Sequence, residues 1–196
     1  MKRKLKRPED VETTKQLLLR RAEQRFAEIG YAKTSIDEIV KQEQLTKGAM
    51  YYHFKDKRDL FEQVVDRLLQ EIVDRILNAI DGQDDPWEKT MIAIDTYLEG
   101  CLQLAYRRIV IQEAPAILGW KEWREKEKRS VMKLSTMLLM ELMASSYIKE
   151  QSVELLNDIL FGAITEAAIG IAHSNDPSEA RIQAKSILER MLKAMT

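Results

Sequence analysis

Two helix-start signals lie close together near the beginning of the chain, and each precedes an apolar face only about two turns long. At the first signal, Ser35 can cap a helix while Glu38, three residues later, reaches back to it. At the second, Thr46 offers another capping hydroxyl, and Met50 and Phe54 then fall four residues apart on the inner face. Helices this short are marginal in isolation, so both must pack on other parts of the chain.

The outer face of the second helix carries residues that suit DNA. Two adjacent tyrosines beside a lysine are costly to leave on a surface that contacts nothing. In a major groove, the lysine can donate to guanine edges or phosphates, small residues allow close approach, and hydroxyls and an imidazole can donate to phosphates. The outward residues are Lys47, Gly48, Ala49, Tyr51, Tyr52 and His53.

A resemblance to the tetracycline-repressor (TetR) family lies in the run GYAKTSIDEIVKQEQLTKGAMYYHFKDKRDLF, Gly30 to Phe61. The family's DNA-binding domain typically joins an early Gly-Tyr, a Thr-Ser helix start, a Lys-Gly helix start, Tyr-Tyr-His-Phe and a following lysine. With the preceding helix from Thr14 to Ile29, the resemblance covers about a quarter of the chain. The chain departs from the family in the turn, where it has Glu43 and Gln44 in place of a small residue and glycine. A left-handed Gln44 would cost roughly 1 kcal/mol.

The resemblance implies an all-α fold, in which an N-terminal three-helix helix-turn-helix domain is joined by a long helix to a C-terminal helical ligand-binding and dimerisation domain. We therefore expect a DNA-binding domain with a basic arm at residues 1–56 and an effector-binding and dimerisation domain at residues 57–196. Double-stranded DNA is the implied partner. The expected DNA contacts also include Thr34, Ser35, Thr46 and Lys57. Thr34 could equally serve only as a cap, and Lys57 could be an ordinary surface lysine.

The composition excludes several other classes of protein. With 45% hydrophobic and 32% charged residues, four prolines and seven glycines, the chain fits a helical globular protein. One cysteine and two histidines support neither a disulfide nor a metal cluster, so we expect no metal and no cofactor. We also see no apolar run approaching the roughly 20 residues of a membrane helix, and no signal core after the basic start. The expected location is cytoplasmic, without membrane contact.

Charge is distributed unevenly along the chain. Residues 1–60 hold fifteen Lys and Arg against ten Asp and Glu, whereas the remainder holds sixteen against twenty-two. The basic end suits a polyanion, and the acidic remainder discourages nonspecific wrapping of DNA. The arm formed by residues 2–7 is either a solvated tail or an additional contact to phosphates or the minor groove.

Later helices follow from caps and apolar periodicity. Asp56 should start a long helix that reaches about Ala79 and could couple two domains. The boundary DGQDDP follows, and Asp85 can cap a helix running to about Ala105. A short helix should end before Pro115. Residues 120 to about 146 then read as one helix, beginning with KEWREKEKR as a solvated charge run.

Aromatic, methionine and cysteine residues gather in these middle helices. Each alone is more simply a core residue, and the resemblance is what favours the wall of an adaptable apolar effector pocket. The single carboxylate in the set could contact a ligand or lie at a solvent-exposed rim. The candidates are Trp87, Met91, Tyr97, Cys101, Tyr106, Trp120, Trp123, Met132 and Glu166.

The last two helices, residues 152–172 and 178–195, are apolar over more than one face, and glycine and alanine are interspersed in the first of them. This pattern predicts burial against a second copy of the chain, and the resembled family dimerises through such a pair.

The favoured function is a ligand-responsive DNA-binding regulator, a repressor by family analogy, which binds a pseudo-palindromic operator as a homodimer. A small apolar or amphipathic effector would shift the long helix through the Asp81 region and release the DNA. The alternative is a DNA-binding dimer without an effector, whose larger domain serves assembly or protein contacts. An enzyme is disfavoured, because the chain has no phosphate loop and no nucleophile motif.

Overall fold

The computed structural model of the protein describes residues 8–42 and 45–195. The basic arm and the turn at Glu43 and Gln44 lie outside the described residues. The described residues form ten α-helices and one π-helical segment, without a β-strand. The expected all-α fold is therefore confirmed.

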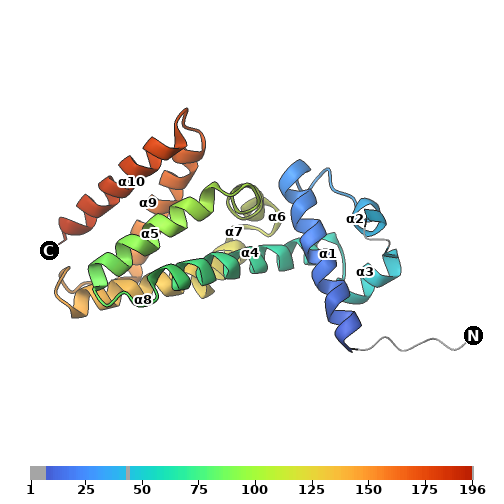
Figure 1. The fold of residues 1–196 in the computed structure, drawn as a ribbon, viewed down its shortest axis with the longest axis horizontal. Helices are drawn as coiled ribbons and strands as arrows, with labels where there is room; N and C mark the ends of the chain where they lie inside the picture. Colours follow the sequence, from blue (N-terminus) through green and yellow to red (C-terminus); the bar gives the residue numbers. More distant parts are fainter. Residues whose placement is uncertain (1–7, 43–44, 196) are drawn as a thin grey trace, which may run out of the picture.

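The helices divide between the two ends of an elongated molecule (Figure 1). Helices α1 to α3 gather at one end, α5 and α8 to α10 at the other, and α4 runs between them. The bounds are α1 Pro8–Ile29, α2 Ile36–Gln42, α3 Lys47–His53, α4 Lys57–Ile80, α5 Pro86–Leu102, η1 Tyr106–Glu113, α6 Ala114–Ile117, α7 Trp120–Arg129, α8 Val131–Ala144, α9 Val153–Ala172 and α10 Pro177–Lys193.

The two short helices start where the capping residues predict. The Ser35 hydroxyl oxygen accepts from the Glu38 backbone N–H at 3.2 Å, and the Thr46 hydroxyl oxygen accepts from the Ala49 N–H at 3.2 Å. The Glu38 carboxylate is held by Arg25 of α1 at 3.1 Å. Each helix therefore begins with one capped backbone donor, and both helices pack against α1.

The inner face of α3 completes the core at this end of the molecule. Met50 and Phe54 are fully buried, as the four-residue spacing predicts. Three further aromatic rings pack beside them, with Phe26 and Phe61 edge to face at 5.2 Å between centroids and Tyr31 against Phe61 at 5.0 Å. Because Phe26 belongs to α1 and Phe61 to α4, these rings join the long helix to α1, and the short helices pack on α1.

Helix α4 has the cap and the apolar stripe that the sequence predicts. The Asp56 carboxylate accepts from the Asp59 N–H at 2.8 Å, and the helix spans 24 residues, or about 36 Å. Eight residues of the stripe are buried: Leu60, Phe61, Val64, Val65, Leu68, Leu69, Ile72 and Ile76. The first part of the stripe packs with α1 and the later part with α5.

The predicted single helix over residues 120–146 is wrong, because the chain breaks at Ser130 between α7 and α8. The Ser130 hydroxyl donates to the Lys126 carbonyl at 2.7 Å and lies 3.3 Å from the Glu127 carbonyl. A serine that bonds to the preceding turn competes with helix continuation. The break leaves α7 as a separate ten-residue helix.

The segment before Pro115 also differs from expectation. Tyr106–Glu113 is π-helical, and the chain continues into α6 with Pro115 in its first turn, where a missing N–H costs nothing. Helices of the π type are rare and occur frequently at functional sites.

Helix α9 corrects the expectation that no segment approaches membrane-spanning length. It has 20 residues and a mean hydropathy of 1.5, so by length and composition alone it could cross a membrane. Only part of it is buried within the chain, since 39% of its most apolar window is covered. Leu155 and Ile159 lie on its exposed side.

Replacing Phe54 with alanine should lower the free energy of unfolding by about 3–5 kcal/mol, because a fully buried ring leaves a cavity. Tyr52→Ala, two residues earlier on the outer face, should change it by no more than about 0.5 kcal/mol. Urea unfolding of both variants measures the difference. Equal losses in the two variants would contradict this assignment of inner and outer faces.

Candidate functional site

The outer face of α3 is open to solvent. Tyr51 is 53% exposed and Tyr52 is 74% exposed, and the Lys47 side chain also projects outward. The Tyr52 ring contacts the His53 ring edge to face at 5.0 Å between centroids. Gly48 is exposed and Ala49 is half-buried, so the backbone between these side chains is accessible. Six residues that the sequence places on one helical face therefore lie on one short helix at the end of the molecule.

The Lys47 side chain makes only a weak, solvent-exposed ion pair. Its ammonium lies 2.7 Å from the Asp37 carboxylate of α2, and both side chains are well exposed. An exposed ion pair of this kind contributes only about 0–1 kcal/mol, so it can exchange for another anion at little cost.

Thr34 and Lys57 are engaged within the fold. Thr34 is buried, and its hydroxyl donates to the Gly30 carbonyl at the end of α1 at 2.8 Å. The Lys57 ammonium donates to the Thr34 carbonyl at 2.8 Å and lies 4.3 Å from the Tyr31 ring centroid. Partial burial lowers the pKa of Lys57. Their expected phosphate contacts stay predictions.

Ser35 and Thr46 combine two possible roles. Each hydroxyl oxygen accepts a bond from its helix, as described above, and each residue is exposed. A hydroxyl that accepts in this way retains its own hydrogen for donation, so both could still donate to a phosphate.

A cavity of about 60 Å³ lies in the larger bundle, between α4, α5, α8, α9 and α10. Its lining is almost entirely apolar and includes Ile94, Tyr97, Leu138, Phe161 and Leu188. An apolar cavity of about 150 Å³ can hold benzene. A ligand of that size would therefore have to displace side chains here.

Of the nine pocket candidates, Tyr97 alone is among the described residues that line this cavity. Met91, Cys101, Tyr106, Trp123 and Met132 are buried elsewhere in the core. Trp87 is half-buried against the Tyr147 ring, at 5.9 Å between centroids. Trp120 and Glu166 lie on the surface. Most of the nine candidates are buried, as their apolar side chains predict. Which of them line the cavity depends on how the helices cross.

A buried polar cluster borders the cavity. Tyr97 and Tyr106 are 5% and 4% exposed, and their rings meet edge to face at 6.1 Å between centroids. Their hydroxyls interact with each other and with the Cys101 thiol, yet neither oxygen has a well-formed hydrogen bond among the described residues. A buried polar group left in this state typically costs about 1–3 kcal/mol. Burial raises the pKa of both phenols well above their ordinary value, and that of Cys101 to about 12.

Glu127 belongs to this cluster, although the sequence reading assigned it to a solvated charge run. It is only 2% exposed, and burial raises its pKa to about 7 despite an ion pair with Arg124 at 3.1 Å. Its charge also raises the pKa values of both phenols. The missed signal is its spacing, because Glu127 follows Trp123 by four residues and so shares the buried face of α7.

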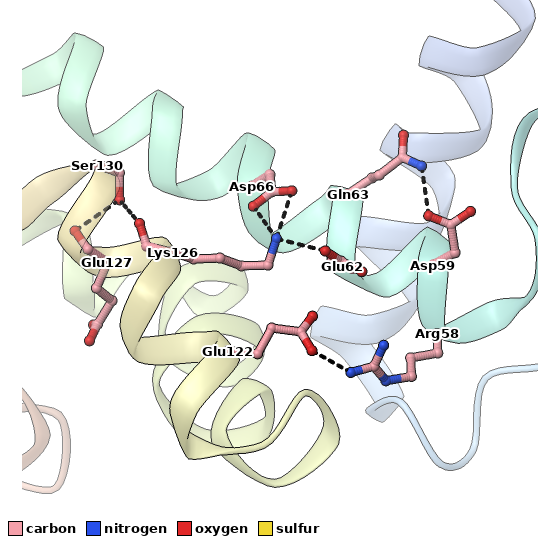
Figure 2. Close-up of polar contacts among 9 residues, drawn as sticks. All are labelled: Arg58, Asp59, Glu62, Gln63, Asp66, Glu122, Lys126, Glu127 and Ser130. Atoms are coloured by element: carbon pink, nitrogen blue, oxygen red, sulfur yellow. Dashed lines mark hydrogen bonds and ion pairs between the residues drawn. The ribbon is translucent and has the colours of Figure 1, made fainter.

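The opposite face of α7 is tied to α4 by ion pairs (Figure 2). Arg58 contacts Glu122 at 2.7 Å, and Lys126 lies 2.9 Å from Glu62 and 2.7 Å from Asp66. Figure 2 shows Lys126 reaching toward α4 while the adjacent Glu127 points away from it. Helix α7 therefore contacts both the buried cluster and the long helix.

A second connection joins η1 to α1. The Arg108 guanidinium donates to the carbonyls of Ala27 and Glu28 at 3.1 and 2.9 Å, which caps the end of α1. The Glu113 carboxylate accepts from the Tyr31 N–H at 2.9 Å. Because η1 begins at Tyr106, one short segment contacts both the buried cluster and the end of the molecule that carries α1 to α3.

Replacing Glu127 with glutamine should reduce the loss of stability between pH 4.5 and about 7. In this interval the folded chain retains a proton that the unfolded chain, with a pKa near 4.5, has released. The contribution of Glu127 to the free energy of unfolding is therefore fully present below pH 4.5 and is lost as the pH rises through about 7. The loss is at most roughly 3 kcal/mol. Urea unfolding across this range tests it, with the exposed Glu125→Gln as control. If the free energy of unfolding of wild type and of Glu127→Gln changes with pH in the same way, the raised pKa of Glu127 is contradicted.

Comparisons with known proteins agree with this architecture. Residues 18–64 match the family described as bacterial regulatory proteins, tetR family, and residues 87–195 match the tetracyclin repressor-like C-terminal domain. The chain is 27% identical over 169 residues to the transposon Tn10 TetC protein of Escherichia coli, covering 86% of this chain and 85% of that protein. It is 42% identical to the transcriptional regulator AcrR of Shigella flexneri over 64 residues, which cover 33% of this chain and 29% of that protein.

A solved structure extends the likeness to the whole fold. A TetR-family transcriptional regulator from Pectobacterium atrosepticum superimposes with a TM-score of 0.80 at 30% identity, covering 97% of both chains. The matched family regions coincide with the helices that present α3 and with the bundle that contains the cavity. The chain belongs to the TetR family of DNA-binding transcriptional regulators.

Proposed function

We propose that this protein is a cytoplasmic repressor that binds a pseudo-palindromic operator as a homodimer and is released by a small apolar or amphipathic effector. The observation that carries the proposal is the joint presence of an exposed α3 face and an apolar cavity lined in part by Tyr97. Tyr97 belongs to a buried cluster whose segments η1 and α7 contact α1 and α4. The boundary between a DNA-binding domain at residues 1–56 and an effector and dimerisation domain at residues 57–196 is part of this proposal.

The effector signal would travel through η1 and α7 rather than through the Asp81 region. Both segments contact the buried cluster on one side, and they contact α1 and α4 on the other. A shift of either segment would change the position of α4 relative to α1, and with it the spacing of the two α3 helices in a dimer. A coupling of about 1–3 kcal/mol would lower operator affinity by roughly 5 to 150-fold.

The proposed dimer interface is the exposed side of α9 and α10. Large apolar side chains lie there in solvent, including Leu155 and Ile159 on α9 and Ile182 and Ile187 on α10. A Cβ atom added at Gly162 or Gly170 would meet nothing within 4 Å, so a second backbone can approach closely. A twofold axis through this surface would match the symmetry of a pseudo-palindromic site, with half-sites about one helical turn or a multiple apart.

The alternative is a DNA-binding dimer without an effector, and the small cavity volume favours it. Footprinting on DNA flanking the protein's own gene, repeated with fractionated cell extract, separates the two functions. The proposal expects at least one fraction to release the protein from its site. A protein that binds its site but is released by no fraction, while compounds from those fractions raise its melting temperature, supports the alternative.

Lys47→Ala should weaken operator binding and relax sequence choice at one or two base pairs. Losing a lysine contact to a base edge typically costs about 1–3 kcal/mol of discrimination. Competition binding with operators substituted one base pair at a time measures the change. The exposed Lys133→Ala of α8 is the matched control, because it removes the same charge far from α3. An unchanged base preference in Lys47→Ala would contradict the base contact.

Ile159→Glu should shift the protein from dimer to monomer, because two copies would bury uncompensated carboxylates in an apolar interface. Sedimentation velocity measures the change in mass. Leu77→Glu makes the same substitution at an exposed position of α4 and should leave the dimer intact. A dimeric Ile159→Glu protein with unchanged dissociation would place the interface elsewhere.

A further inference from the structure

The two buried phenols are unexplained by packing alone. Tyr97 and Tyr106 bury their hydroxyls in a largely apolar core, although phenylalanine would fill the same space without a polar group. The described residues offer neither oxygen a well-formed hydrogen bond. Buried polar atoms in this state are uncommon in native proteins and call for a specific explanation, such as a site that a ligand completes.

The pair is positioned to meet a molecule in the cavity. Tyr97 lines the cavity, and its ring contacts Tyr106 on one side and Phe161, another lining residue, at 5.5 Å between centroids on another. Tyr97 therefore brings a phenol to the wall of a largely apolar space, and Tyr106 packs against it from outside the cavity lining. A molecule whose apolar body enters the cavity by displacing lining side chains could place one polar group against these two oxygens.

The surrounding charges favour an uncharged group. Glu127 would repel a carboxylate ligand, and its own charge is already paired with Arg124 rather than left for an organic cation. Arg124 also pairs with Asp158 at 3.1 Å and lies 5.5 Å from the Phe161 ring centroid, so it too is committed. The Cys101 thiol, whose pKa burial raises to about 12, remains neutral. A phenol hydroxyl can both donate and accept, and a ligand hydroxyl does the same.

We propose that the effector is an uncharged molecule with an apolar body and a hydroxyl group, a phenol or an alcohol, whose hydroxyl is bound by Tyr97 and Tyr106. This inference rests on the proposed effector response and identifies the chemical class that the response recognises. It also explains why Tyr106 stands at the start of η1, since a ligand bonded to it would act directly on the segment that caps α1.

Calorimetric titration of the full-length protein without DNA tests the proposal. The probes are phenol and toluene, which match in shape and differ in the hydroxyl, with benzoate and benzylammonium as charged counterparts. We expect phenol to bind at least tenfold more tightly than the other three. Similar affinity for phenol and toluene, a preference for either ion, or no binding of phenol would overturn the proposal.

Tyr97→Phe and Tyr106→Phe supply the matched variants, because each removes one oxygen and keeps the ring. Each should lower phenol affinity at least several-fold and leave toluene affinity unchanged or increased. Tyr147→Phe, which removes the hydroxyl that donates to Asp85 away from the cavity, should leave phenol affinity unchanged. Unchanged phenol affinity in both Tyr97→Phe and Tyr106→Phe would remove these residues from the site.

Operator binding separates this inference from the function on which it rests. If phenol binds, loses affinity in Tyr97→Phe and Tyr106→Phe, and does not alter operator affinity, the hydroxyl site is supported and release by an effector is contradicted. Release of operator by a compound without a hydroxyl, together with no phenol binding, would leave the function standing and overturn the hydroxyl site.

Discussion

The apolar stripe of α4 is the contact on which both ends of the molecule depend. Its first residues complete the aromatic core around Phe26 and Phe61, and its later residues, including Ile72 and Ile76, pack into the larger bundle. Eight buried side chains on this one continuous helix pack into the cores at both ends of the molecule. A displacement of α4 cannot therefore be confined to one of them, because close-packed cores transmit strain.

Polar contacts also connect α4 and α1 to the segments beside the buried cluster. Ion pairs fasten α7 to α4 along one face, and the other face of α7 buries a glutamate beside two phenols. The π-helical segment does the same for α1, with Tyr106 at its start and Arg108 and Glu113 at the DNA-facing end. Buried polar groups contribute little net stability, so a stabilising role alone does not explain their presence here.

The predictions from sequence succeeded where the determining interaction is local. Capping hydroxyls at Ser35 and Thr46, the Asp56 and Asp85 caps, and the four-residue spacing of Met50 and Phe54 all act within a turn or two of helix, and each is confirmed. The break at Ser130 was missed, because apolar periodicity on both sides outweighed one hydroxyl that bonds to the preceding turn. The bounds of α9 and its apolar character were predicted, but the prediction that no segment is apolar enough over about 20 residues to cross a membrane was wrong.

The sequence by itself determined most helix starts and the inward and outward faces of α3, because short-range hydrogen bonds and side-chain periodicity specify them. The motif from Gly30 to Phe61 indicated the family by resemblance. Tertiary structure alone decided which residues surround the cavity, why Tyr97 lines it while Trp120 and Glu166 lie outside, and why Glu127 is buried. These outcomes depend on where distant helices cross. The spacing in the charged run KEWREKEKR places Trp123 and Glu127 on one face, but which helices cover that face depends on the tertiary structure.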